Sequence, residues 1–154
     1  MSKIFKTSED IVELAIDKFN ETGLPQVGVN LKVMSITKAK QPLKISRANA
    51  TTEYLIKDSD VVTLFVFEDA FDRLTDDYKE ILMEGALSNV SYDTEKERIV
   101  IDNSQYGEVL RMRKKYQNYV DIVETSQLII DDIIEEEKMK KEQEREAKKA
   151  NKNK

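Results

Sequence analysis

The sequence predicts an α+β fold in which a small mixed β-sheet packs against helices, followed by a long charged C-terminal helix. Apolar residues alternate over residues 27–33 and run almost without interruption over residues 61–67, which is typical of strands. Residues 11–19 and 78–89 instead carry apolar side chains at the three-to-four spacing of helices. After Ile134 apolar residues almost disappear, so we expect one domain over the first 134 residues and a separate tail.

The first predicted element is a helix that Thr7 or Ser8 can cap and that runs to about Glu21. Gly23 and Pro25 follow and should end it, because neither residue continues a helix readily. Its apolar face consists of Ile11, Leu14, Ala15 and Phe19.

Two predicted strands come next. The alternation over residues 27–36 indicates a strand with one buried face, and a shift in register at Val33 and Met34 is compatible with a β-bulge. Leu43 and Ile45 share one face of a second extended stretch. Because Pro42 cannot donate a hydrogen bond to a neighbouring strand, we expect this second stretch to lie at an edge of the sheet.

The next segment contains the best candidate for a central strand. Residues 47–52 should form a loop, Tyr54 and Ile56 a short strand, and residues 57–60 a turn. The apolar run over residues 61–67 then has the composition of a strand buried on both faces. Residues 68–74 should connect this strand to the following helix, with Phe71 and Leu74 packed beneath the start of that helix.

The central predicted helix covers residues 75–90. Thr75 is a suitable N-cap, and Asp76 and Asp77 place negative charge at the positive end of the helix dipole. One side of this helix should face the core and carries Tyr78, Ile81, Leu82, Gly85, Ala86 and Asn89. The neighbouring side carries Met83, Glu84 and Leu87.

The C-terminal third predicts a hairpin followed by helix. Residues 90–93 and 98–101 are apolar or β-branched stretches that flank a polar turn, which favours a β-hairpin. A helix should begin near Ser104 and present Val109, Met112, Tyr116, Val120 and Val123. Two outcomes remain open at Thr125 and Ser126, where this helix either continues or breaks before the aliphatic residues 128–134.

The composition excludes several classes of enzyme. The chain of 154 residues has no Cys and no His, which removes disulfides, thiol nucleophiles, histidine-based triads and histidine-ligated zinc. Its four Gly cannot form the phosphate-binding loops of nucleotide-binding proteins. Carboxylate chemistry remains, either with Mg²⁺ or in a two-carboxylate hydrolase, but no pattern indicates it. No signal-peptide or membrane-spanning apolar run occurs, so we expect a protein that is neither secreted nor membrane-bound.

The order of these elements resembles that of the phage metallopeptidase family, small zincin-like enzymes of tailed bacteriophages. The similarity covers roughly residues 11–119 and is most telling over residues 77–93, Asp-Tyr-Lys-Glu-Ile-Leu-Met-Glu-Gly-Ala-Leu-Ser-Asn-Val-Ser-Tyr-Asp. In the family this stretch holds the His-Glu-x-x-His motif, which supplies two zinc ligands and a general base. The resemblance therefore implies a zincin-like fold and a phage origin.

The catalytic residues implied by the resemblance are almost all missing. Met83 and Leu87 stand at the positions of the two His, Glu84 matches the general base, and a further ligand position falls near Ser104. One Glu cannot replace three zinc ligands, so we expect no zinc, no cofactor and no catalytic residue, with Glu84 a vestige and Met83 and Leu87 filling the vacated pocket. Asp102, Asn103 and Ser104 could ligate a hard cation, although an N-cap and turn explains them better.

The tail predicts an exposed helix and an interaction region. Residues 135–154 hold eight Lys or Arg and six Glu, with Glu136–Lys140, Glu137–Lys141 and Glu144–Lys148 as candidate ion pairs. This gives the tail a net charge of +2 and leaves −7 on the rest of the chain, which argues against nucleic acid as a partner of this protein, with only weak contacts to phosphates open to the tail. The aliphatic residues 128–134 either pack back on the domain or project toward a partner.

These observations predict a non-enzymatic bacteriophage protein, a structural or assembly component associated with the virion. Its expected partners are other virion proteins or further copies of the same chain, contacted through residues 128–154, and its expected location is the virion or the host cytoplasm. Two alternatives remain. One is a phage hydrolase that uses Glu84 and other carboxylates with a borrowed or non-zinc metal, and the other is a phage protein that binds a host factor.

Overall fold

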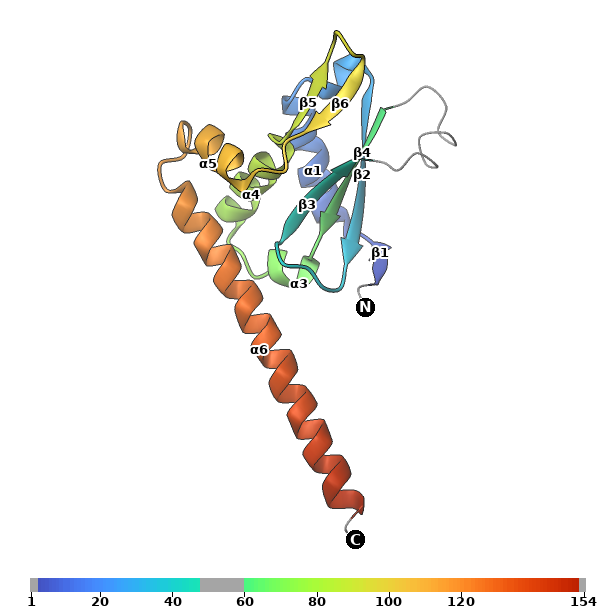
Figure 1. Ribbon diagram of the computed structural model, residues 1–154, viewed down its shortest axis with the longest axis vertical. Helices are drawn as coiled ribbons and strands as arrows, with labels where there is room; N and C mark the ends of the chain where they lie inside the picture. The colour runs from blue at the N-terminus through green and yellow to red at the C-terminus, as the bar shows by residue number, and fades with distance from the viewer. Residues whose placement is uncertain (1–2, 48–59, 153–154) are drawn as a thin grey trace.

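The computed structural model describes residues 3–47 and 60–152 and has the predicted α+β fold, with a long C-terminal helix that extends from a compact body (Figure 1). In chain order the elements are β1 (Ile4–Lys6), α1 (Glu9–Glu21), the 3₁₀ turn η1 (Leu24–Val27), β2 (Val29–Ile36), β3 (Leu43–Arg47), β4 (Asp60–Val66), α3 (Glu68–Phe71), α4 (Asp76–Leu87), β5 (Val90–Asp93), β6 (Arg98–Ile101), α5 (Gln105–Arg113) and α6 (Tyr119–Lys152). The expected strand at Tyr54 and Ile56, with most of the loop and turn around it, falls outside the described residues.

The main sheet has the strand order β1-β2-β4-β3, in which β2 and β4 are parallel and the other neighbours are antiparallel. Among the described strands β3 pairs only with β4, in agreement with the edge position expected after Pro42. The β2–β4 pairing runs residue by residue from Val29 opposite Asp60 to Ser35 opposite Val66, so the suggested bulge does not form. The short strand β1 was not predicted, because its three exposed residues have no apolar pattern.

β4 is a central strand, but only one of its faces is completely covered. Val62, Leu64 and Val66 are fully buried against the core that includes residues of α1 and α4. Thr63 and Phe65, which point to the opposite face, are half-buried. Val61 and Phe67, at the two ends of the apolar run, are buried, so the expectation that both faces are buried holds at the ends and fails only at Thr63 and Phe65. An uninterrupted apolar run does not by itself distinguish a strand covered on two faces from one covered on a single face.

The first helix agrees with the sequence, whereas β2 begins later than expected. Ser8 occupies the N-cap of α1, and the chain leaves the helix through Thr22 and Gly23. Gly23 and Gly28 both have positive φ, 78° and 86°, and they bracket η1. Val27 belongs to that turn and is exposed. The apolar alternation over residues 27–33 therefore begins with a turn residue, and the strand itself starts at Val29.

The hairpin forms as predicted, and the helix after it breaks at an unexpected place. β5 and β6 pair from Val90 opposite Ile101 to Asp93 opposite Arg98. α5 ends at Arg113, and α6 starts at Tyr119 and passes through Thr125 and Ser126 without interruption. The break lies in residues 114–118, where polar contacts of Tyr116 and Tyr119 with other helices fix the connection.

α6 settles the alternatives left open for its aliphatic residues. Ile130 and Ile133 are buried against Phe67 and Ala70 in a second, smaller apolar cluster. Leu128 is 64% exposed, so not every aliphatic residue of this stretch packs. The helix thus packs back on the body up to Ile133 and then extends beyond it (Figure 1). No helix in the described part of the chain combines the length and apolar character required to cross a membrane.

Candidate functional site

The central helix α4 begins as its sequence predicts. The Thr75 hydroxyl accepts a hydrogen bond from the backbone N–H of Tyr78 at 3.3 Å, and Asp76 and Asp77 occupy the first turn. These contacts satisfy one of the free N–H groups of the first turn and place negative charge at the positive end of the helix. Phe71 and Leu74 are buried, as expected for residues that pack at the start of α4.

The buried side of α4 is wider than the periodicity predicts. Met83 and Leu87 are both fully buried and belong to the main core, together with Leu82 and Ala86. The sequence pattern predicts Met83 and Leu87 on a side next to the core, where the resemblance implies a vacated metal pocket. The structure instead makes them core residues, because α4 is packed by α1, by α5 and α6, and by β3 at the same time.

Glu84 lies on the one side of α4 that remains partly open, and other side chains bind its carboxylate. Lys115 Nζ donates to Glu84 Oε1 at 2.7 Å, and the Tyr116 hydroxyl donates to Oε2 at 2.8 Å. Burial acts to raise the pKa of Glu84, but these hydrogen bonds outweigh it and lower the pKa below its ordinary value. Glu84 is therefore a poor proton acceptor, and a general base is usually tuned in the opposite direction.

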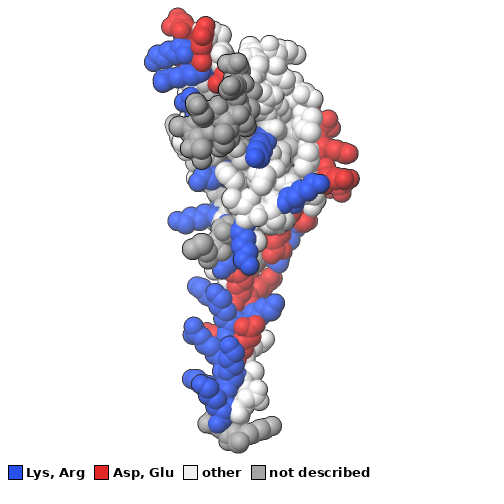
Figure 2. Space-filling model, turned by 90° about the vertical axis from the view of Figure 1, so that its right-hand side faces the viewer, with Lys and Arg blue, Asp and Glu red and all other residues white. Residues whose placement is uncertain are grey.

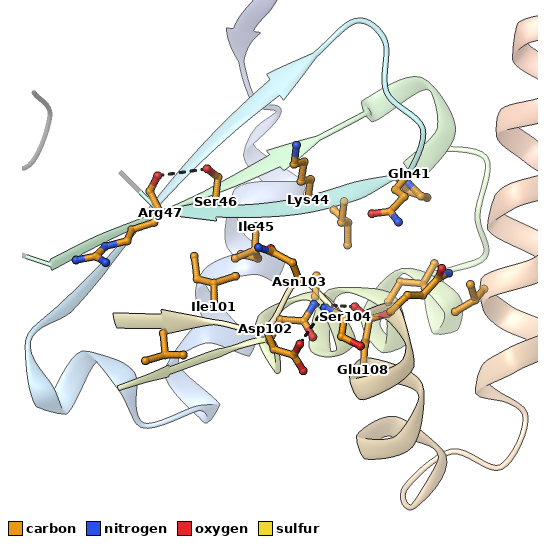
Figure 3. A pocket seen from close by; sticks show the side chains of 18 of the residues that line it. Gln41, Lys44, Ile45, Ser46, Arg47, Ile101, Asp102, Asn103, Ser104 and Glu108 are labelled. Atoms are coloured by element: carbon orange, nitrogen blue, oxygen red, sulfur yellow. Dashed lines mark hydrogen bonds between the residues drawn. The ribbon is translucent and has the colours of Figure 1, made fainter. Parts of the chain in front are cut away.

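A groove lies on another side of α4, between the edge strand β3 and the segment that joins β6 to α5 (Figure 3). This groove has a volume of about 850 Å³, and Leu82 and Ala86 of α4 contribute to its wall. Ile45 of β3 and Ile101 of β6 lie across from each other within it. Glu84 is not among the residues that line the groove, so Glu84 and the groove are separate features.

Two strand edges border the groove. β3 is hydrogen-bonded only to β4, and β6 only to β5, among the strands that the structure describes. Free strand edges offer N–H and C=O groups to an extended polypeptide.

Ser104, the fourth predicted site residue, lines the groove as a helix cap. Its hydroxyl accepts a hydrogen bond from the backbone N–H of Gly107 at 3.2 Å, and its own N–H donates to Asp102 at 2.8 Å. Asp102 also accepts a hydrogen bond from Arg111 at 2.8 Å, and this contact lowers the pKa of Asp102. The N-cap and turn interpretation of Asp102, Asn103 and Ser104 is thus confirmed for Asp102 and Ser104. Nowhere in residues 3–47 and 60–152 do three acidic side chains gather as metal ligands would.

A polar network that the sequence did not reveal connects the groove to the start of α6. Arg111 donates to Asp102 and to Asn89, Asn89 donates to Glu108 at 2.9 Å, and the Tyr119 hydroxyl donates to Glu108 at 2.6 Å. Tyr119 is fully buried, and burial raises its pKa well above the ordinary value. The network therefore connects the C-terminal end of α4 to α5 and to the start of α6 by hydrogen bonds.

Two glycines inside helices are the sequence features from which this network could have been predicted. A Cβ atom at Gly85 would lie 2.1 Å from the Tyr119 hydroxyl, and a Cβ atom at Gly107 would lie 2.3 Å from Asp102. Glycine is unfavourable within a helix by about 1 kcal/mol relative to alanine, so its presence there often marks a close approach. Reading Gly85 in this way would have predicted a bulky partner against α4.

Comparison with known proteins identifies no relative of this chain. No protein family, curated protein or solved structure matches the chain. The geometry of the described residues and the sequence resemblance are therefore what any functional proposal has to rest on.

Proposed function

We propose that this chain is a non-enzymatic interaction protein, a structural or assembly component of a bacteriophage virion. Its body, residues 3–133, holds the start of α6 in place, and the distal part of α6 contacts the partner. The observation that carries the proposal is the extension of α6 beyond the body. All residues of 138–152, hereafter the arm, are exposed and helical (Figure 1).

The charged side chains of the arm do not form ion pairs with the side chains of the body that the structure describes. The pairs expected at Glu136–Lys140, Glu137–Lys141 and Glu144–Lys148 do not form. Glu136 instead binds Arg73 through two hydrogen bonds of 3.1 and 2.9 Å, and Glu137 lies 3.9 Å from Lys38. No ion pair involves a side chain of the arm in the part of the chain that the structure describes. A helix of this composition is marginal alone in water, which favours a role in contacting something else.

The surroundings of Glu84 support the non-enzymatic part of the proposal. Both oxygens of its carboxylate accept hydrogen bonds from Lys115 and Tyr116, and its pKa is lowered. An acid-base catalyst at this position would need a raised pKa and access to a substrate proton. The phage origin rests on the resemblance to the phage metallopeptidases over roughly residues 11–119.

Peptide mass spectrometry of purified phage particles tests the proposal. We expect the full chain at tens of copies per particle, and we expect a chain truncated after Glu137 to be folded but depleted from particles. The cut keeps the contacts of Glu136 and Glu137 with the body. A chain whose residues 138–154 are shuffled is the control for arm length and composition, and it should also be depleted.

Two results would contradict the proposal. The first is absence of the full chain from particles. The second is stoichiometric metal in the purified protein, together with peptide cleavage that disappears in Glu84→Gln.

A further inference from the structure

The arm has two chemically different faces. At about 100° of rotation per residue, six of its seven basic side chains fall within about 100° of arc. This basic stripe consists of Lys138, Lys141, Arg145, Lys148, Lys149 and Lys152. Figure 2 shows Lys and Arg gathered along one side of the distal part of α6, beside uncharged surface. Met139, Gln143, Ala147 and Ala150 lie on the opposite face.

Only Lys and Arg side chains lie within the arc of the basic stripe. No acidic, apolar or aromatic residue of the arm falls within its arc, and Glu142 lies at the border. The nearest acidic residues toward the body, Glu136 and Glu137, are directed to Arg73 and Lys38. From Lys138 to Lys152 the stripe spans about 21 Å at 1.5 Å per residue. It is therefore a straight row of unpaired cations presented to solvent.

From this row of cations we propose that the arm binds the phosphate backbone of a nucleic-acid duplex. The proposal names the partner of the arm and so rests on the proposed function. A protein surface fits the stripe less well, because Lys is depleted from the cores of protein interfaces and the stripe contains no aromatic or aliphatic anchor. A single strand also fits less well, since single-strand binding uses aromatic side chains on which bases stack. A helix with only Lys and Arg on one face matches phosphates.

The separation between arm and body removes the electrostatic objection to nucleic acid. Residues 138–154 contain eight Lys or Arg and three Glu, which gives them a net charge of +5. Because the whole chain has a net charge of −5, the first 137 residues carry a net charge of −10. An acidic body repels phosphates at short range. The arm extends over a distance of more than two Debye lengths, which are about 8 Å each at physiological salt, so the duplex can contact the stripe while the repulsion is screened.

Fluorescence anisotropy with a labelled mixed-sequence DNA duplex of about 30 base pairs tests the proposal across about 50 to 200 mM salt. The full chain should bind, and the logarithm of the association constant should fall linearly with the logarithm of the salt concentration, by about 0.9 per phosphate contact. With about five contacts, this salt increase weakens binding several hundred-fold. The sequence of the duplex should make little difference.

Two charge-matched variants separate the stripe from the net charge of the arm. The variant Lys141→Glu with Arg145→Glu changes the charge by −4 within the stripe. The variant Lys140→Glu with Gln143→Glu and Ala147→Glu also changes it by −4, but on the opposite face. We expect the stripe variant to lose at least about tenfold in affinity and about two units of salt slope. The opposite-face variant should stay within about threefold of the unchanged chain.

Three results would overturn the inference. They are equal losses in the two variants, tighter binding to a single strand or to poly-glutamate than to the duplex, and no binding of the full chain at about 50 mM salt. Circular dichroism of both variants ensures that the helix is retained. If particles still require the arm while the duplex is not bound, the proposed function stands and this inference fails. If the duplex is bound but particles lack the chain, the virion role fails instead.

Discussion

The two ends of α6 belong to one continuous helix of 34 residues and yet are stabilised differently. In the proximal end, residues 119–133, buried side chains recur every three or four positions and include Tyr119, Ile122, Ile130 and Ile133. In the arm every residue is exposed. The comparison shows that packing holds the proximal end as a helix, whereas the arm is helical mainly because it continues a helix that has already formed.

The largest expected effect comes from removing the packing of the proximal end. Ile130→Asp places an unpaired charge in the fully buried position beside Phe67 and Ala70, and we expect a loss of about 4 kcal/mol or more in the free energy of unfolding. Leu128→Asp introduces the same charge two residues earlier on the exposed side and should cost less than about 1 kcal/mol. Urea denaturation measures both values. Equal losses would mean that α6 is not anchored through Ile130.

A smaller effect is expected where the proximal end meets α4. Gly85→Ala would place a Cβ atom 2.1 Å from the Tyr119 hydroxyl, and the resulting overpacking should destabilise the fold by about 1–3 kcal/mol. Tyr119→Phe removes that hydroxyl, so the double variant should be less destabilised than the sum of the single changes. A double-mutant cycle by thermal or urea unfolding gives the coupling. Strict additivity would show that Gly85 and Tyr119 are not in contact.

The smallest effect concerns the connection that precedes α6 and depends on pH. Because the pKa of Glu84 is lowered in the folded chain, its charged form stabilises the fold above the unfolded pKa, and this stability is lost as the pH falls through the folded pKa. The difference in stability between the natural chain and Glu84→Gln should therefore shrink as the pH is lowered from about 7 to about 3. Tyr116→Phe removes one of the two hydrogen bonds and should give a smaller change of the same sign. A pH-independent difference would contradict the assigned contacts.

The sequence predicted those parts of the fold that depend on local patterns. The caps at Thr75 and Ser104 and the hairpin over residues 90–101 follow from short-range chemistry, and all are present. Ser8 occupies the N-cap position of α1 but makes no capping hydrogen bond, and its hydroxyl donates to Glu68 instead. The exposed helical tail also follows, because a segment with so few apolar residues has no apolar face to bury. The pairs assigned to that tail were wrong: Glu136 and Glu137 contact Arg73 and Lys38 of the body instead, and Glu144 forms no ion pair with Lys148.

The parts that failed depend on contacts between distant residues. Met83 and Leu87 appeared to lie beside the core, but three sides of α4 are packed in the folded chain. The end of α5 and the network around Glu108 depend on Tyr116 and Tyr119 reaching carboxylates of other elements, which periodicity does not encode. The groove arises between two strand edges that are separate in the sequence, and no motif marks it.

The absence of a hinge between the two ends of α6 has a mechanical consequence. From Ile133, the last buried residue, to Lys152 the helix extends about 28 Å at 1.5 Å per residue. A straight rod held at one end acts as a lever, so a tilt of about 10° at the contacts of Ile130 and Ile133 displaces its tip by about 5 Å. Small changes in the packing of Phe67 and Ala70 are thus amplified at the tip, and a load on the tip is transmitted to this small apolar cluster.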